Sequence, residues 1–405
     1  MPFGIRNRQT APQRALQQHR VLKHLRNPHG QSKYFRPFLL HFRPRRVPER
    51  TLRFTLSWGL GGMAMVLLLL LIGTGLMLKF MYEPAPDRAY DSIVYLNNHV
   101  PFGLLTRNVH WWSANALILV ALLHLLRVFY SWAFLPPRHA NWIIGLVALA
   151  AVVVSNFSCY LLPWDKVAYW AITISTSMLD YVPIVGEPVK QWILGGSEPG
   201  ARTLVIFYAT HTAILPVILL LALPFHFWRI RRAGGLVVPR EPDEPAGTRG
   251  AVISSWPHLI MREIAVALLT IAVILVLAML FNAPLAEQAN PGLSPNPTKA
   301  PWYFVGVQEL LMHFHPVFAI LVIPLTLLAG LACLPFIRDD DDTSGLWFVS
   351  GKGRKLSLAA AALAVVLTVG GVLLDEYLLP AGVPGLVSSG LLPFAAMLLL
   401  CAGFY

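Results

Sequence analysis

The sequence predicts an all-α membrane protein, a polytopic bundle of eight transmembrane helices. Of its 405 residues, 56% are hydrophobic and only 13% are charged, whereas about a quarter of the residues in a water-soluble domain are charged. Several stretches of about 20 residues carry no charge, and that length lets a helix cross the ~30 Å hydrocarbon layer of a bilayer. These observations exclude a soluble globular enzyme, a disordered chain and a collagen-like chain.

Eight runs without Lys, Arg, Asp or Glu define the expected helices. They cover residues 54–78, 108–126, 139–164, 203–228, 264–286, 310–337, 356–374 and 377–405. A polar, proline-bearing segment separates the fourth run from the fifth, so we expect two modules. The expected order is a basic N-terminal extension (1–53), a four-helix domain (54–232), a linker (233–255) and a C-terminal domain of four further helices (256–405).

The distribution of basic residues predicts the orientation. An even number of spans places both termini on one side, and 25 of the 32 Lys and Arg residues lie in the N-terminal extension and in the loops of that side. Such loops face the cytoplasm, so we expect a multi-pass protein of the bacterial inner membrane with both termini cytoplasmic. The same rule accounts for most of the net charge of +12, and nucleic-acid binding is therefore not expected.

The cysteines and the N-terminus exclude further classes. Cys159, Cys333 and Cys401 lie far apart, so they form no disulfide framework, zinc site or C-x-x-C-H attachment site for covalent haem. The region up to Arg53 is polar and rich in Arg, without the apolar core of a secretory signal. We expect the first helix to direct insertion.

Four histidines within the apolar runs carry the chemistry. His110 and His124 are 14 residues apart, and His211 and His226 are 15 apart. At ~100° per residue each pair returns to one face of its helix, with its members ~21 Å apart in depth. Because the two spans run in the same direction, His110 should meet His211 near the outer surface and His124 should meet His226 near the cytoplasm. Paired histidines suit haem iron, whereas zinc needs three or four ligands at one depth.

The alternative is four isolated, hydrogen-bonded histidines. Burying four imidazoles in lipid is costly unless they have a function. The alternative also leaves the matched spacing unexplained, so the two-haem interpretation is preferred.

Small residues accompany the histidines. Gly61 and Gly75 on the first span are 14 residues apart, as are Gly145 and Cys159 on the third. Small residues let a flat macrocycle lie against a helix backbone, although glycines also permit close packing of helices. The repeated interval favours a cofactor-binding role.

Two arginines flank the second span. Arg107 and Arg127 each lie three residues from a histidine of that span. A guanidinium there can pair with a haem propionate. The alternative is a charge that sets the orientation of the helix.

Four segments resemble the cytochrome b/b6 family. They are RNVHWWSANALILVALLHLLRVF, NWIIGLVALAAVVVSNFSCYLLPWDKVAYWA, PIVGEPVKQWILGG and FYATHTAILP. The resemblance covers the first four spans, and the part from about Trp256 is similar to the family's C-terminal domain, which is subunit IV in b6f complexes. The chain therefore resembles a fusion of both parts.

The resemblance implies a subunit that oxidises a membrane quinol, menaquinol or ubiquinol, and carries two non-covalent b-type haems. It implies His110 and His211 as ligands of an outer, low-potential haem, and His124 and His226 as ligands of an inner, high-potential haem. One electron would pass to a Rieske-type iron–sulfur protein or a c-type cytochrome, and the other would cross the membrane through the haems. A homodimer is expected on the same ground.

The sequence departs from the family at the quinol-oxidation motif. Where the family has Pro-Glu-Trp-Tyr, this chain has Ala300, Pro301, Trp302 and Tyr303. The resemblance places the last three at the quinol site, but the carboxylate that would accept a quinol proton is missing. Because oxidation of a quinol needs a proton acceptor, we expect Glu309 in that role, with anchoring of its segment as the alternative.

Three other positions differ from the family. Gly59 stands where the b6 branch has the cysteine that attaches an additional haem, so two haems per chain are expected. Cys159 stands where the family has a haem-facing glycine, and its thiol adds bulk. Ile206 stands where the family has an arginine, which is expected to change the potential of the outer haem.

Two other functions account for parts of the sequence. A quinone-facing anchor that exchanges electrons with a multihaem c-type cytochrome, without a Rieske protein, would keep both haems and tolerate the missing glutamate. A haem-free transporter would use the histidines to carry protons or metal ions, but it would need carboxylates beside them. The two histidine-bearing runs contain none.

Overall fold

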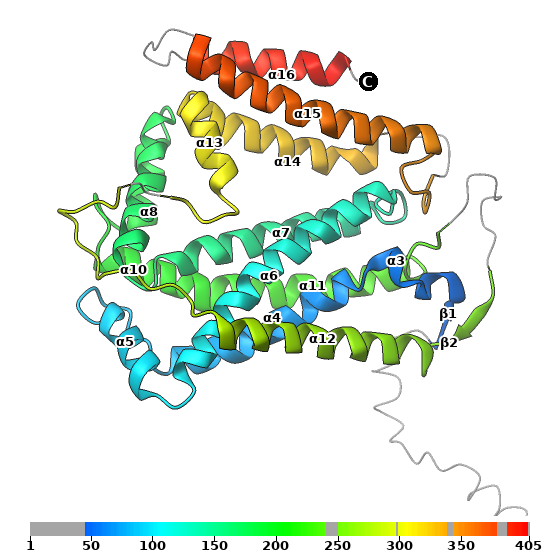
Figure 1. The fold of residues 1–405 in the computed structure, drawn as a ribbon, viewed down its shortest axis with the longest axis horizontal. Helices are drawn as coiled ribbons and strands as arrows, with labels where there is room; N and C mark the ends of the chain where they lie inside the picture. Colours follow the sequence, from blue (N-terminus) through cyan, green and yellow to red (C-terminus); the bar gives the residue numbers. More distant parts are fainter. Residues whose placement is uncertain (1–44, 240–249, 297–298, 338–342, 379–386, 404–405) are drawn as a thin grey trace, which may run out of the picture. The chain divides into compact units, whose positions relative to one another are not determined.

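Helices of membrane length dominate the fold (Figure 1). The structure is a computed structural model that describes residues 45–239, 250–296, 299–337, 343–378 and 387–403. Within these residues, seven helices are long and apolar enough to cross a bilayer, and a shorter apolar helix, Ser389–Leu399, lies at the place of the eighth expected span. The expected all-α membrane bundle is therefore confirmed.

The first four expected spans follow one another, and the first and third of the loops between them contain short helices. The spans are formed by α3 (Phe54–Ser57) with α4 (Leu60–Lys79), by α6 (Gly103–Tyr130), by α7 (His139–Tyr160), and by α10 (Ala201–Ala209), η3 (Thr210–Ile214) and α11 (Leu215–Arg232) in continuation. The loops contain α5 (Ala89–His99), α8 (Lys166–Ser177), η2 (Met178–Tyr181) and α9 (Gly186–Leu194).

The second half is less regular. Its elements are α12 (His258–Leu280), α13 (Val305–His313), η4 (Phe318–Val322), α14 (Ile323–Cys333), η5 (Leu334–Phe336), α15 (Gly351–Leu378), η6 (Val387–Leu391) and α16 (Leu392–Gly403). The uncharged run 310–337 does not form one helix. α13 ends at His313 and Phe314 is extended. Pro316 follows, and a helix usually ends at or before the residue that precedes a proline.

A small antiparallel sheet was not expected from the sequence. β1 (Arg46–Pro48) pairs with β2 (Val252–Ser254), so that Val47 lies opposite Ile253, and the 3-10 turn η1 (Glu49–Leu52) follows β1. The sheet joins the end of the expected N-terminal extension to the end of the expected linker. Residues 1–44, which are most of the extension, and residues 240–249 in the middle of the linker lie outside the described residues.

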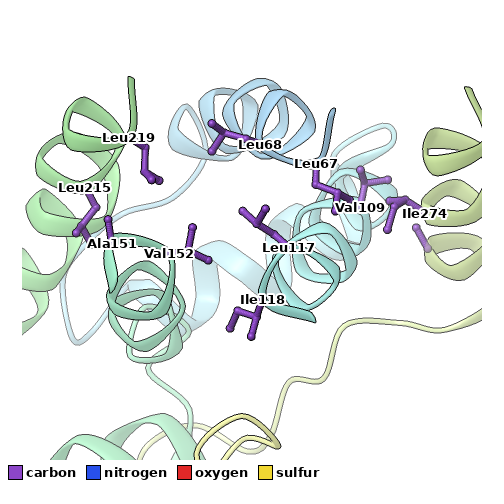
Figure 2. Packing of buried hydrophobic residues seen from close by; sticks show 11 residues of the cluster. Leu67, Leu68, Val109, Leu117, Ile118, Ala151, Val152, Leu215, Leu219 and Ile274 are labelled. Atoms are coloured by element: carbon purple, nitrogen blue, oxygen red, sulfur yellow. The ribbon is translucent and has the colours of Figure 1, made fainter. Parts of the chain in front are cut away.

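The core lies among the helices that carry the histidines and their neighbours. α4 packs against α6, α7 against α11, and α12 against both α4 and α6. Figure 2 shows leucine, valine and alanine side chains of these helices converging on one another. The buried residues of this cluster are Leu67, Leu68, Val109, Leu117, Ile118, Ala151, Val152, Leu215, Leu219, Ile274 and Ala278.

Asn108 joins the two halves of the chain. Its side chain is 2% exposed. Its amide donates to the Ala278 carbonyl and to Asn282 Oδ1, both at 2.9 Å, and its Oδ1 accepts from the Ala283 N–H at 2.8 Å. These bonds satisfy backbone groups at the end of α12, where the helix itself provides no partner.

Asp165 makes a second connection. It caps α8 by accepting from the Ala168 N–H, and its other oxygen accepts from the Ala286 N–H at 2.9 Å. The segment between α12 and α13 is thereby held against the loop after α7.

Candidate functional site

The structure brings His110 and His211 together. Their ring centroids are 6.3 Å apart, with the ring planes at 73°. Two imidazoles that share one metal through bonds of ~2 Å have ring centroids roughly 6 Å apart. The first histidine pair therefore has the separation that joint ligation of one metal ion requires.

His124 and His226 form the second level, and they are close enough to interact electrostatically. Within the described part of the chain, no group of three or more His, Cys, Asp or Glu side chains gathers as a metal site. The histidines thus stand in pairs at two levels of the bundle.

The Nδ1 atoms of the His110–His211 pair are held by hydrogen bonds. Thr74 Oγ1 lies 2.9 Å from His110 Nδ1. His211 Nδ1 lies 3.0 Å from the Ser155 carbonyl oxygen and 3.3 Å from Ser158 Oγ. When Nδ1 carries the proton, Nε2 keeps its lone pair for a metal, and this arrangement is characteristic of histidine ligands.

Glycines face the imidazoles across the helix pairs. A β-carbon at Gly75 would lie 3.1 Å from His110 Cε1, and one at Gly61 would lie 3.8 Å from His124 Cε1. On the other side of the bundle, a β-carbon at Gly145 would lie 3.5 Å from the Cε1 of His226. Three glycines chosen from their spacing thus each lie against a histidine of the neighbouring helix.

An apolar layer separates the two levels. Leu68 is seven residues from both Gly61 and Gly75, and Leu117 is seven residues from both histidines of α6. At ~1.5 Å per residue this layer is ~10 Å from either level. Figure 2 shows Leu68, Leu117, Val152 and Leu219 on the four surrounding helices.

A π turn explains the unequal spacing of the histidines. In η3 the Leu215 N–H bonds to the Thr210 carbonyl, five residues earlier, and such a turn holds one residue more than an α turn. The 15-residue interval from His211 to His226 therefore covers about the same rotation as the 14-residue interval on α6. Pro216 follows, and the wide turn relieves the clash of its ring with the carbonyl four residues before it.

The same arrangement recurs twice in the second half. η4 ends two residues before Pro324, and η6 ends two residues before Pro393. Proline thus coincides with a π turn at each of the three places where the described residues contain one.

The two arginines beside the histidines differ in their surroundings. Arg127 is 7% exposed, its Nε donates to the Leu56 carbonyl at 2.8 Å, and its Nη2 has no hydrogen-bond partner in the described structure. Arg107 instead donates to the carbonyls of Ala283 and Pro284. Arg127 has a free buried donor for an anionic group, while Arg107 holds the loop after α12.

The quinol-motif residues lie on the segment before α13. Trp302 donates to Asn115 Oδ1 at 2.8 Å, and the Pro301 carbonyl accepts from the Phe304 N–H. The Tyr303 hydroxyl lies 3.4 Å from the Asn156 carbonyl on α7, and burial raises the pKa of this tyrosine. Pro301, Trp302 and Tyr303 are thereby fixed between α6 and α7.

Glu309 lies within α13, and its side chain is exposed. Tyr303, by contrast, packs against the buried cluster around Leu117. The carboxylate predicted from the sequence therefore lies on the surface of the described structure.

Several residues of the site were missed in the sequence. Thr74, Ser155 and Ser158 touch the imidazoles of His110 and His211, and Asn108 and Asp165 fix the loop after α12. A hydroxyl one residue before a histidine-facing glycine, as in Thr74–Gly75, was a signal that the spacing argument could have used. The contacts of Asn108 and Asp165 join residues more than a hundred positions apart, and no local pattern indicates them.

The residues present fit a haem at each level. The paired imidazoles would provide two nitrogen ligands per site, the facing glycines leave the space that a β-carbon would fill, and the orphaned Nη2 of Arg127 would donate to a propionate. Cys159 donates to the Asn156 carbonyl at 3.2 Å, so its thiol is held on its own helix.

Comparisons with known proteins bear on the same region. The family model described as Cytochrome b/b6/petB matches residues 49–234. Cytochrome b6 of Acaryochloris marina and that of Porphyra purpurea are each 37% identical over 175 residues, which are 43% of this chain and 81% of the relative. Cytochrome b6 of Prochlorococcus marinus is 38% identical over 80% of its length.

A solved structure matches nearly the whole chain. It is a chain of a hyperthermophilic respiratory Complex III, and it superposes with a TM-score of 0.72 at 25% identity, covering 91% of this chain and 94% of the other. The match extends over the second half, which the cytochrome b6 relatives do not cover. The cytochrome b6 relatives are 37% or 38% identical to this chain over about four-fifths of their own length. This identity exceeds what a shared helical bundle requires, so the chain is a multi-pass membrane protein of the cytochrome b/b6 family.

Proposed function

We propose that this chain is the diheme b-type cytochrome subunit of a quinol-oxidising electron-transfer complex. The observation that carries the proposal is the stacking of two histidine pairs, the outer one with centroids 6.3 Å apart, each beside glycines of the neighbouring helix. The relatives named cytochrome b6 and the match to a Complex III chain support it.

The four histidines have one role each in this proposal. His110 and His211 would hold the outer haem, and His124 and His226 the inner one. Haem supplies a carrier for one electron at each level. The chain contributes the depth of each level, the apolar layer between them and the orientation of the imidazoles.

The remaining cofactor-binding residues shape these sites. Gly61, Gly75 and Gly145 leave room beside the imidazoles, and Arg127 donates its free Nη2 to a propionate. Arg107 is already bonded to the loop after α12, so its contribution is to bind that loop to the outer end of α6.

The quinol site is proposed at the segment before α13. Pro301 and Trp302 form its wall, and Tyr303 packs against the buried cluster. A tyrosine is protonated at neutral pH, and burial raises the pKa of Tyr303 further, so it can donate a hydrogen bond but cannot remove a proton. Glu309 is exposed and can accept the proton that the missing motif carboxylate would have taken.

The proposed assembly follows the relatives. The complex would contain a Rieske-type iron–sulfur protein or a c-type cytochrome on the outer side, with two copies of this chain. Residues 54–232 would form the diheme domain, 233–255 the linker and 256–405 a subunit IV-like domain, with residues 1–53 and both termini on the cytoplasmic side of a bacterial inner membrane. The quinone would be menaquinone or ubiquinone.

A haem count tests the proposal. The purified protein should contain two non-covalent b-type haems with separate potentials, and His124→Ala should lose one of them. His99→Ala is the matched control, because His99 is exposed at the end of α5 and should leave both haems in place. Absence of b-type absorbance from the wild-type protein would refute the function.

A second function is favoured by one observation. Pro301 stands at the place of the motif carboxylate and the nearest candidate, Glu309, is exposed, as an anchor without bifurcation would allow. The two functions can be distinguished by oxidising the outer partner first and then adding quinol. In a bifurcating complex this raises the reduced b-type absorbance, whereas in an anchor that feeds a multihaem cytochrome it lowers that absorbance.

A further inference from the structure

The hydroxyl of Thr74 donates one hydrogen bond and accepts another. It lies 2.6 Å from the Leu70 carbonyl, to which it must donate because a carbonyl has no proton. Its lone pair then faces His110 Nδ1 at 2.9 Å. The direction of the second bond is fixed by the first, so Nδ1 is the donor and Thr74 the acceptor.

This arrangement selects one tautomer of His110. With the proton on Nδ1, the lone pair is on Nε2, the atom that a metal binds. An acceptor on Nδ1–H also makes the imidazole more basic, which favours the more highly charged state of a bound metal. The Leu71 carbonyl also faces this ring, so the hydroxyl is one of two acceptors there.

The other imidazole of the outer pair is held differently. His211 Nδ1 lies 3.0 Å from the Ser155 carbonyl, a group that no side-chain substitution removes. Ser158 Oγ is farther away, at 3.3 Å, and donates to the same carbonyl. Thr74 is therefore the place in the outer pair where a single side chain sets the hydrogen bonding of a ligand.

We propose that Thr74 is a positioning residue that fixes the Nδ1–H tautomer of His110 and lowers the reduction potential of the outer haem. The proposal rests on the proposed function, because it needs a haem on His110. It goes beyond that function by assigning the potential of one site to a hydroxyl on a neighbouring helix.

The test compares three variants by redox titration of the intact protein. Thr74→Val keeps the branched shape and removes only the hydroxyl, and Thr74→Ser restores it. Thr270→Val is the matched control, since Thr270 is also half-buried in a membrane helix and donates to the carbonyl four residues earlier at 2.7 Å.

Thr74→Val should raise the midpoint potential of one haem and leave the other unchanged. The expected size is a three- to tenfold change in the ratio of oxidised to reduced haem, the upper end being ~59 mV for a one-electron couple. The low-spin ferric EPR signal of the same haem should shift with it. Thr74→Ser should return both readouts towards the wild type, and Thr270→Val should change neither.

Two outcomes would overturn the proposal. One is that both haems remain bound in Thr74→Val and their midpoint potentials equal those of Thr270→Val. The other is equal loss of the outer haem in Thr74→Val and Thr74→Ser, which would mean that the side chain serves packing alone. If the wild-type protein bound no haem, the proposed function would fail, and that result is separate from either of these.

Discussion

The backbone of Gly75 lies directly against the imidazole of His110, so that a β-carbon there would be 3.1 Å from Cε1. This is closer than carbon atoms normally approach, and the imidazole sits between the neighbouring helix and the opposite histidine. Even one methyl group would therefore displace the ring.

Gly75→Ala should accordingly shift the spectrum and potential of the outer haem, or lower its occupancy, without affecting the inner one. Gly73→Ala is the control, because a β-carbon at Gly73 meets nothing within 4 Å. Both variants gain the same helix propensity of about 1 kcal/mol, so only the contact with His110 distinguishes them. Equal spectra for the two variants would contradict the packing described here.

Asn108→Leu should destabilise the protein by about 1–3 kcal/mol, since the side chain would no longer satisfy buried backbone groups at the end of α12. Thermal unfolding in detergent, followed by helix content, measures the change. Asn98→Leu alters the same residue type at an exposed position of α5 and should shift the midpoint far less. Similar midpoints for both variants would mean that Asn108 does not join the two halves.

Tyr82→Phe should make stability less dependent on alkaline pH. Burial, and secondarily Tyr208, raises the pKa of Tyr82 above its ordinary value. Below pH ~10 the phenol is neutral in both folded and unfolded chains, but above it only the unfolded chain ionises, so the wild type loses stability. The difference in unfolding midpoint between wild type and variant should therefore change in the variant's favour as the pH rises from ~8 to ~11.

At neutral pH the same variant should be less stable by about 1 kcal/mol, because the hydroxyl donates to the Leu162 carbonyl at 2.7 Å. The two effects have opposite signs, so the pH series separates them. A constant difference at every pH would show that Tyr82 ionises in the folded protein as it does in the unfolded one.

Glu309→Gln should slow quinol oxidation by roughly 100-fold or more, as loss of a general base requires. The assay uses the assembled complex with its acceptor. Glu287→Gln is the control, since Glu287 lies on the loop after α12 with its carboxylate 85% exposed and 3.9 Å from Lys166. An unchanged rate and pH profile in Glu309→Gln would remove this residue from the proposed site.

The sequence predicted the membrane helices and the pairing of the histidines well, because both depend on periodic patterns. Uncharged length defines a span, and the angular period of an α-helix places His110 and His124 on one face. Membrane burial strengthens both signals, since a polar residue among apolar ones is costly there.

Interactions between distant segments could not be predicted in the same way. The pairing of β1 with β2 joins residues some two hundred positions apart, and three-residue strands have no recognisable alternation. The role of Arg107 was predicted from its distance to His110 along the chain, but its guanidinium is bonded to the loop after α12. Which partner an arginine takes depends on a loop whose path no local pattern specifies.

The π turn at Thr210–Ile214 holds one residue more than the fourth span needs to keep its two histidines on one face. Removing one residue there would leave an ordinary α turn and a 14-residue interval, with both imidazoles still on the same face. Elsewhere between His211 and His226 a deletion would rotate everything beyond it by ~100° and turn one histidine away from its partner. The wide turn therefore marks the place between these histidines where the loss of one residue is tolerated.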